Sequence, residues 1–151
     1  MARFRYSMQN ILNIKEKMET QAKQRFGEAK RNLDLEEEAL ERLFLLKEEI
    51  EENARKVLMG ELDVHEIEDS QMSRIICDEK IAAQKVRVSE AENELEKARN
   101  ELEEAVKERK THEKLKERQF DEFVREENRA ESKVIDELTT YTYGQKVGEN
   151  G

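Results

Sequence analysis

The chain has no proline and no tryptophan, and its 151 residues include only five glycines and one cysteine. The absence of proline removes the residue that most strongly interrupts helices. The single cysteine, Cys77, excludes an intramolecular disulfide and fits a reducing compartment such as the cytoplasm. With 36% hydrophobic and 5% aromatic residues, the chain has too little apolar material to fill a compact core of this length.

Charged residues make up 43% of the chain, and the net charge is -9. Long helices and coiled coils have this composition, and so do disordered chains, which lack the periodicity described below. The acidic balance disfavours nucleic acid or an anionic membrane as the main partner. Because no apolar run is long enough, we expect no signal peptide and no direct membrane insertion.

A turn is predicted at residues 59–63, where Gly60 is the only glycine between Gly27 and Gly144. Glycine commonly ends a helix because it enters the left-handed conformation without penalty. Asp63 can cap a following helix through its carboxylate, and Glu66 has the spacing of a capping box. We therefore expect one helix at residues 3–58 and a second at 64–143.

Steps of three and four residues give each predicted helix a mostly apolar series, as in a coiled-coil seam. One irregular step, a stutter after Ala22, is needed in the first helix. The series in the first helix is Phe4, Met8, Ile11, Lys15, Met18, Ala22, Phe26, Ala29, Leu33, Glu36, Leu40, Leu43, Lys47, Ile50, Ala54 and Val57. The series in the second helix is Cys77, Ile81, Gln84, Val88, Ala91, Leu95, Ala98, Leu102 and Ala105.

Folding the two series about Gly60 pairs large residues with large ones and alanine with alanine. The one polar layer pairs Glu36 with Gln84. This match predicts an all-α fold: one long antiparallel two-helix coiled-coil hairpin over residues 1–151, with the second helix overhanging the first. The run of threonine and tyrosine at 139–143 should fray, Gly144 should end the helix, and 144–151 should form a disordered tail.

Two groups of apolar residues lie outside a plain seam or lack a matching partner. The first lies beside the turn, around residues 43–46 and 72–86, and is a partner surface, a local shift of register or a surface for self-association. The second is at the open end, where Phe4, Met8 and Ile11 would face Lys116, His112 and Arg109. The overhang beyond Lys116 adds Phe120 and Phe123, and it either binds a partner or frays.

Chemistry-bearing motifs are scarce in the sequence. There is no glycine-rich phosphate loop, and the two histidines, His65 and His112, lie too far apart in the predicted hairpin to share a metal. Cys77 occupies a seam position with no base to activate it. We therefore expect no enzyme activity and no cofactor.

Residues near both ends of the chain form a recognisable pattern. Toward the N-terminus they are Phe4, Tyr6, Gln9, Ile11, Leu12, Ile14, Lys15, Glu19, Ala22, Phe26, Gly27, Glu37, Leu40 and Leu43. At the C-terminal end they are Glu131, Val134, Asp136, Glu137 and Leu138. The pattern covers nearly the whole chain and resembles the FliJ family of the bacterial flagellar type III export apparatus.

The resemblance implies a hairpin similar to the central stalk of rotary ATPases and a cytoplasmic protein held at the inner membrane by the export apparatus. It implies three partners: the hexameric export ATPase, the cytoplasmic domain of the export gate, and export chaperones. The gate-binding positions that it implies, called the turn-side patch below, are Leu43, Leu46, Ile50, Met72, Ile76 and Ala83. The positions expected to meet the ATPase ring, called the open-end surface below, are Phe4, Met8, Ile11, Arg109, Lys116, Phe120 and Phe123.

Two other functions fit a charged helical hairpin. One is a structural coiled-coil spacer, and the apolar residues outside the seam are the only argument against it. The other is the stalk subunit of a rotary ATP synthase, which usually carries an additional globular region.

Overall fold

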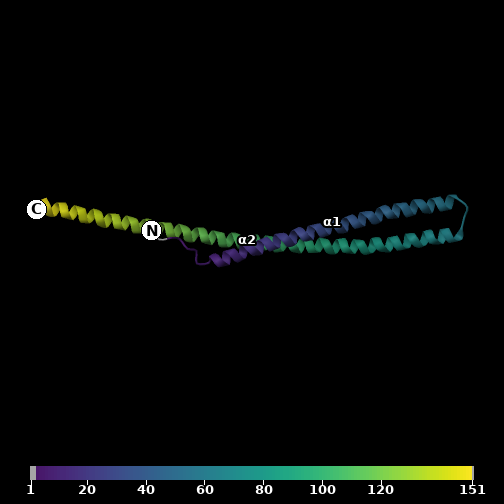
Figure 1. The fold of residues 1–151 in the computed structure, drawn as a ribbon, viewed down its shortest axis with the longest axis horizontal. Coiled ribbons are helices and arrows are strands. Elements are labelled where there is room, and N and C mark those ends of the chain that lie inside the picture. Colours follow the sequence, from purple (N-terminus) through teal and green to yellow (C-terminus); the bar gives the residue numbers. More distant parts are fainter. Residues whose placement is uncertain (1–2, 151) are drawn as a thin grey trace. The chain divides into compact units, whose positions relative to one another are not determined.

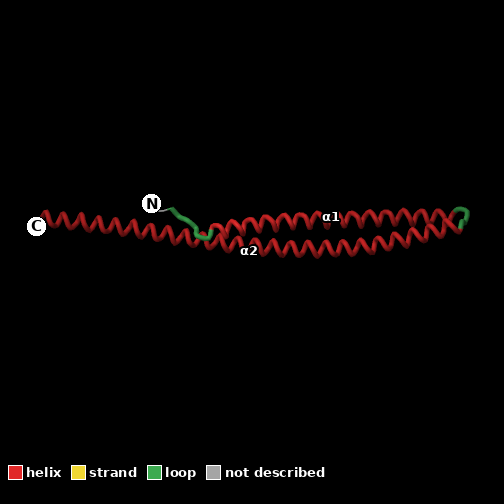
Figure 2. The backbone as a smooth tube through the Cα atoms, turned by 60° about the horizontal axis from the view of Figure 1, so that its bottom comes forward, coloured by secondary structure: helices red, strands yellow, loops and turns green. Residues whose placement is uncertain are grey.

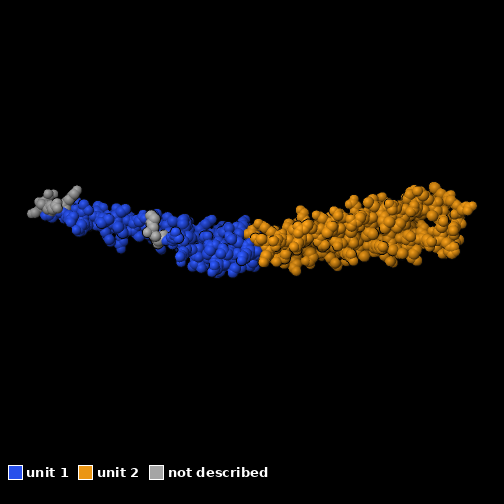
Figure 3. Space-filling model, viewed as in Figure 1, with its two compact units in different colours: residues 1–18, 105–151 blue, residues 19–104 orange. Residues whose placement is uncertain are grey.

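The computed structural model describes residues 3–150, which form two helices, α1 (Gln9–Met59) and α2 (Val64–Asn150). The helices run antiparallel and are joined by a short turn, so the predicted all-α hairpin is confirmed (Figure 1). No strand forms within residues 3–150 (Figure 2). The chain divides into two compact units, one made of residues 19–104 and the other of the residues up to Met18 together with those from Ala105 onward (Figure 3).

The turn forms because the last groups of α1 and the first groups of α2 find local hydrogen-bond partners. The Gly60 amide donates to the Lys56 carbonyl at 3.2 Å. Asp63 caps α2 as predicted, since its Oδ1 accepts a hydrogen bond from the His65 amide at 2.9 Å. The Asp63 carbonyl accepts the first helical bond, from the Ile67 amide at 3.1 Å.

The expected left-handed conformation of Gly60 is wrong, because no described residue, glycine or other, has a positive φ. A Cβ built on Gly60 would meet only the Lys56 carbonyl oxygen, at 3.8 Å. We therefore expect Gly60→Ala to raise the free energy of unfolding by about 0.5 kcal/mol, because alanine restricts the unfolded chain. Chemical denaturation measures this, with the helical position Gly27→Ala as control; a loss of stability confined to Gly60→Ala would contradict the conformation.

The core of the unit formed by residues 19–104 is the predicted seam. Its buried members are Ala22, Cys77, Ile81, Gln84, Ala91 and Ala98, and the residues that face them in the predicted pairing are buried or half-buried. Two predicted pairs make direct contacts. The Cys77 thiol lies 3.7 Å from the Leu43 carbonyl oxygen, to which it donates, and the Gln84 amide donates to both the carbonyl, at 2.9 Å, and the carboxylate of Glu36.

The first turns of α1 differ from the predicted seam. Ile11 and Met18 are 38% and 43% exposed, whereas Leu12 and Glu19 are buried. From Leu12 the buried positions reach Ala22 by regular steps of three and four, and no stutter is needed. The predicted series began at Phe4 and Met8, and that starting point placed Ile11 and Met18 in the seam. Residues 3–8 are not helical, so they do not determine which side of α1 is buried.

Both outer helix ends also differ from the prediction. α1 begins at Gln9 and not at residue 3, because residues 3–8 follow a different path over α2. α2 does not end at Gly144 but continues to Asn150, while Gly151 lies outside the described residues. The Thr140 and Thr142 hydroxyls donate to carbonyls four residues earlier, at 2.8 and 2.9 Å, so these polar side chains are accommodated within the helix.

Candidate functional site

The turn-side patch lies in the unit formed by residues 19–104 and is largely open to solvent. Leu46, Met72 and Ile76 are 41%, 56% and 44% exposed, and Ala83 is also exposed. Leu43 and Ile50 are half-buried, as expected for residues that also belong to the seam. The structure therefore leaves four of the six predicted side chains available to a partner.

Two contacts between the helices bring both halves of the turn-side patch to the same level. Leu43 receives the Cys77 thiol, and the Lys47 ammonium lies 2.9 Å from the Asp78 carboxylate. Leu46 precedes Lys47 and Ile76 precedes Cys77, so Leu46 and Ile76 lie at neighbouring levels of the hairpin. Direct contact between these two side chains stays a prediction.

The Lys47–Asp78 ion pair has a defined pH dependence. The hydrogen bond that Lys47 donates to the Asp78 carboxylate, followed by the negative charge of that carboxylate, raises the pKa of Lys47 above its ordinary value of 10.5. A raised lysine pKa means that the interaction is fully present below the ordinary lysine value and is lost as pH rises through the folded value. The pair therefore remains intact at neutral pH, although it is exposed and screened by salt.

Further exposed apolar side chains in the same unit were not included in the predicted sites. Phe44 is 42% exposed, and the Lys85 ammonium lies 5.8 Å from the centre of its ring, within the range of a cation–π contact. The sequence signal for Phe44 was the unbroken apolar run Leu43–Leu46, because only one residue of that run can occupy the seam. The other exposed apolar residues of this unit are Leu35, Leu45, Ile75, Val86 and, at the turn, Leu58, Met59, Leu62 and Val64.

The open-end surface lies in the other unit and is arranged differently from the prediction. Phe4 does not face Lys116; its ring packs edge-on against Phe120 and at a tilt against Phe123, with centroid distances of 5.2 and 5.6 Å. Five residues of the open-end surface are half-buried, namely Phe4, Met8, Arg109, Lys116 and Phe123. Ile11 and Phe120 remain 38% and 47% exposed.

The path of residues 3–8 explains this arrangement. A non-helical chain can advance ~3.3 Å per residue, about twice the 1.5 Å rise of a helix. Phe4 can therefore reach farther along α2 than a helical residue at the same position. The overhang beyond Lys116, predicted to have no partner in the first helix, is thus partly covered by the N-terminal segment of the same chain.

Two cations of this unit form ion pairs with carboxylates. The Arg109 guanidinium lies 2.7 Å from the Glu113 carboxylate, and the Lys15 ammonium lies 2.8 Å from the Glu108 carboxylate. The second contact joins α1 to α2. If Arg109 contacts the ATPase ring, the ring must therefore supply a group that competes with the Glu113 carboxylate.

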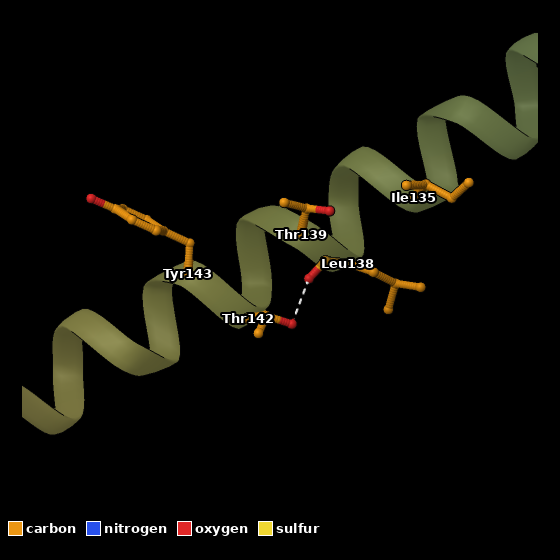
Figure 4. Close-up of a pocket in the computed structure, with 5 residues that line it drawn as sticks. All are labelled: Ile135, Leu138, Thr139, Thr142 and Tyr143. Carbon is orange, nitrogen blue, oxygen red and sulfur yellow. Dashed lines mark hydrogen bonds between the residues drawn. The ribbon is translucent and has the colours of Figure 1, made fainter.

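No cluster of metal-ligating side chains occurs within the described part of the chain. Figure 4 shows a shallow hollow lined by Ile135, Leu138, Thr139, Thr142 and Tyr143, all from consecutive turns of α2. A hollow on a single helix does not enclose a small molecule, because such sites are concave and bury most of their ligand. Neither described helix contains a stretch apolar enough to cross a bilayer.

Comparison with known proteins agrees with this fold. The sequence model described as "Flagellar FliJ protein" matches residues 4–148. A solved structure titled "Structure of a putative YscO homolog CT670 from Chlamydia trachomatis" is similar, with a TM-score of 0.75 and 26% identity. The similarity covers 93% of this chain and 96% of that one. A comparison with curated proteins gave no match.

Proposed function

The chain belongs to the family of flagellar FliJ proteins, which makes it a component of type III export, and we propose that it links the export ATPase to the membrane export gate. In this proposal the turn-side patch binds the cytoplasmic domain of the gate. The open-end surface binds the hexameric ATPase and promotes its assembly and activity. Export chaperones are further partners, and the protein works in the cytoplasm, held at the inner membrane by these contacts.

The exposure of the turn-side patch is the observation that supports the proposal most strongly. The seam already supplies the hairpin with its core, yet Leu46, Met72 and Ile76 remain more than two-fifths exposed. Apolar surface gathered in one place on a soluble protein commonly marks an interface. A spacer would have no use for this patch, which is why the partner-binding function is preferred to that alternative.

The proposal gives the chain a binding role and no reaction of its own. The rival function, the stalk of a rotary ATP synthase, shares the hairpin but predicts different partners. Purified export ATPase and the purified cytoplasmic domain of the gate should each bind the full chain, and ATP hydrolysis should rise when the chain is added. Binding to purified synthase subunits, with none to either export protein, would decide for the rival.

Truncation after Lys116 tests the open-end surface, because it removes Phe120 and Phe123 with the rest of the overhang. We expect stimulation of ATP hydrolysis to fall by about tenfold, the loss typical of removing aromatic anchors. Circular dichroism should still show a helical hairpin, since the seam of residues 19–104 is untouched. A chain truncated after Asn128 keeps both phenylalanines and serves as control. Full stimulation by the shorter chain would contradict the assignment.

A further inference from the structure

The N-terminal segment and the α2 surface beneath it carry opposite charges and aromatic rings that contact each other. Arg3, Phe4 and Arg5 line a shallow pocket together with residues of α2, namely Gln119, Glu122, Phe123 and Glu126. In sequence order the segment carries an aromatic residue between two basic ones, and the helix carries an aromatic residue between two acidic ones. The Phe4–Phe123 ring contact is favourable at its centroid distance of 5.6 Å, and opposite charges that line one pocket attract each other.

The segment is attached to α2 imperfectly. Tyr6 is buried, with only 7% of its surface exposed, but its hydroxyl has no hydrogen-bond partner among the described residues. Nδ1 of His112, also buried, has none among them either. A buried polar atom without a partner costs free energy, so the covering segment is held less tightly than its aromatic contacts alone would suggest.

We propose that the α2 surface around Phe123, Glu122 and Glu126 is a recognition site for an extended segment carrying an aromatic residue between two basic ones. The chain's own Arg3–Phe4–Arg5 occupies this site, and a partner that presents the same chemistry displaces it. This inference extends the proposed function, because the site lies within the open-end surface, and it states what chemistry a partner must offer there.

A peptide with the sequence of residues 3–12, labelled with a fluorophore, tests the site without any export protein. Fluorescence polarisation measures its binding to the full-length chain and to full-length Phe4→Ala, in which the covering ring is removed. The tethered segment competes at an effective concentration of about millimolar, so we expect Phe4→Ala to bind the peptide at least ~10-fold more tightly than the original chain.

Variants of the acidic residues and of the peptide test the recognised chemistry. In the Phe4→Ala background, replacing Glu122 and Glu126 with lysine should weaken binding at least ~10-fold, and added salt should weaken it as well. Replacing Asp136 and Glu137, which lie outside the pocket, should leave binding within ~2-fold. A peptide carrying alanine in place of phenylalanine should not bind.

Tyr6→Phe provides a second, independent variant that keeps the segment in place. Removing the unpartnered hydroxyl should strengthen the contact between the segment and α2. The affinity of Tyr6→Phe for the peptide should therefore be ~5-fold lower than that of the original chain. Failure of the peptide to bind Phe4→Ala would overturn the proposal and make the contact mere packing. A dimer in which the segments exchange between copies would make a second copy the occupant and equally overturn it. Because no ATPase is present, these results stand apart from any failure of the proposed coupling function.

Discussion

Replacing Leu46 and Ile76 together with aspartate is expected to abolish binding to the gate while leaving the hairpin folded. The two side chains are 41% and 44% exposed, so carboxylates placed there remain hydrated in the free protein. Substitutions at such positions usually change stability by about 0.5 kcal/mol or less. At an interface the same carboxylates would be buried without partners, and each lost apolar anchor can cost ~2 kcal/mol.

The expected loss of gate affinity is therefore at least ~100-fold, with motility lost in a flagellated cell. Calorimetry against the purified gate domain measures the affinity, and thermal melting followed by circular dichroism measures the fold. ATPase stimulation should survive, because the open-end surface belongs to the other compact unit.

Leu35 and Leu58 provide the matched control, since each is 61% exposed and lies outside the turn-side patch. Their double replacement with aspartate adds the same charge to the same unit and should leave gate binding intact. If the Leu46 and Ile76 variant unfolds, these residues belong to the core. If it stays folded and still binds, the gate contacts another surface.

Replacing Gln84 with leucine is expected to cost the hairpin about 2 kcal/mol, although leucine is the more apolar residue. Gln84 is 8% exposed, and its amide donates to the carbonyl and the carboxylate of half-buried Glu36. Hydrogen bonds to a charged acceptor contribute about 1.5–3 kcal/mol, and a carboxylate left without its donor loses this contribution. Denaturant unfolding of the single variant measures the effect, with exposed Gln71→Leu as control.

The double variant Glu36→Leu and Gln84→Leu distinguishes two quantities. One is the net contribution of the polar pair to the free energy of unfolding, and the other is the loss caused by removing only one partner. Removing both polar groups should restore most of the stability or exceed it, because a well-packed apolar pair often replaces a buried polar pair without loss. The difference between the single and double variants gives the coupling free energy. A single variant as stable as the original chain would show that the Glu36–Gln84 contact contributes nothing in solution.

The sequence alone determined the helices, the turn and the central pairing. Apolar steps of three and four residues identify the buried side of each helix, because neighbours at these spacings share one face. Asp63 marks the turn by capping α2, Gly60 marks its position without taking the left-handed conformation, and the match of Glu36 with Gln84 sets the register. These signals are local, or they follow from pairing the two helices by turning the chain back at Gly60, so they are visible in the sequence alone.

The tertiary structure decided where α1 begins and what covers the overhang. Periodicity continues through Phe4 and Met8, so the sequence predicted helix there and placed Ile11 and Met18 in the seam. Packing of Phe4 against Phe120 and Phe123 involves residues more than one hundred positions apart, and no local signal reports it. Once residues 3–8 leave the helical path, the seam is free to take the phase that buries Leu12, and the N-terminal segment occupies the surface that the sequence had left open.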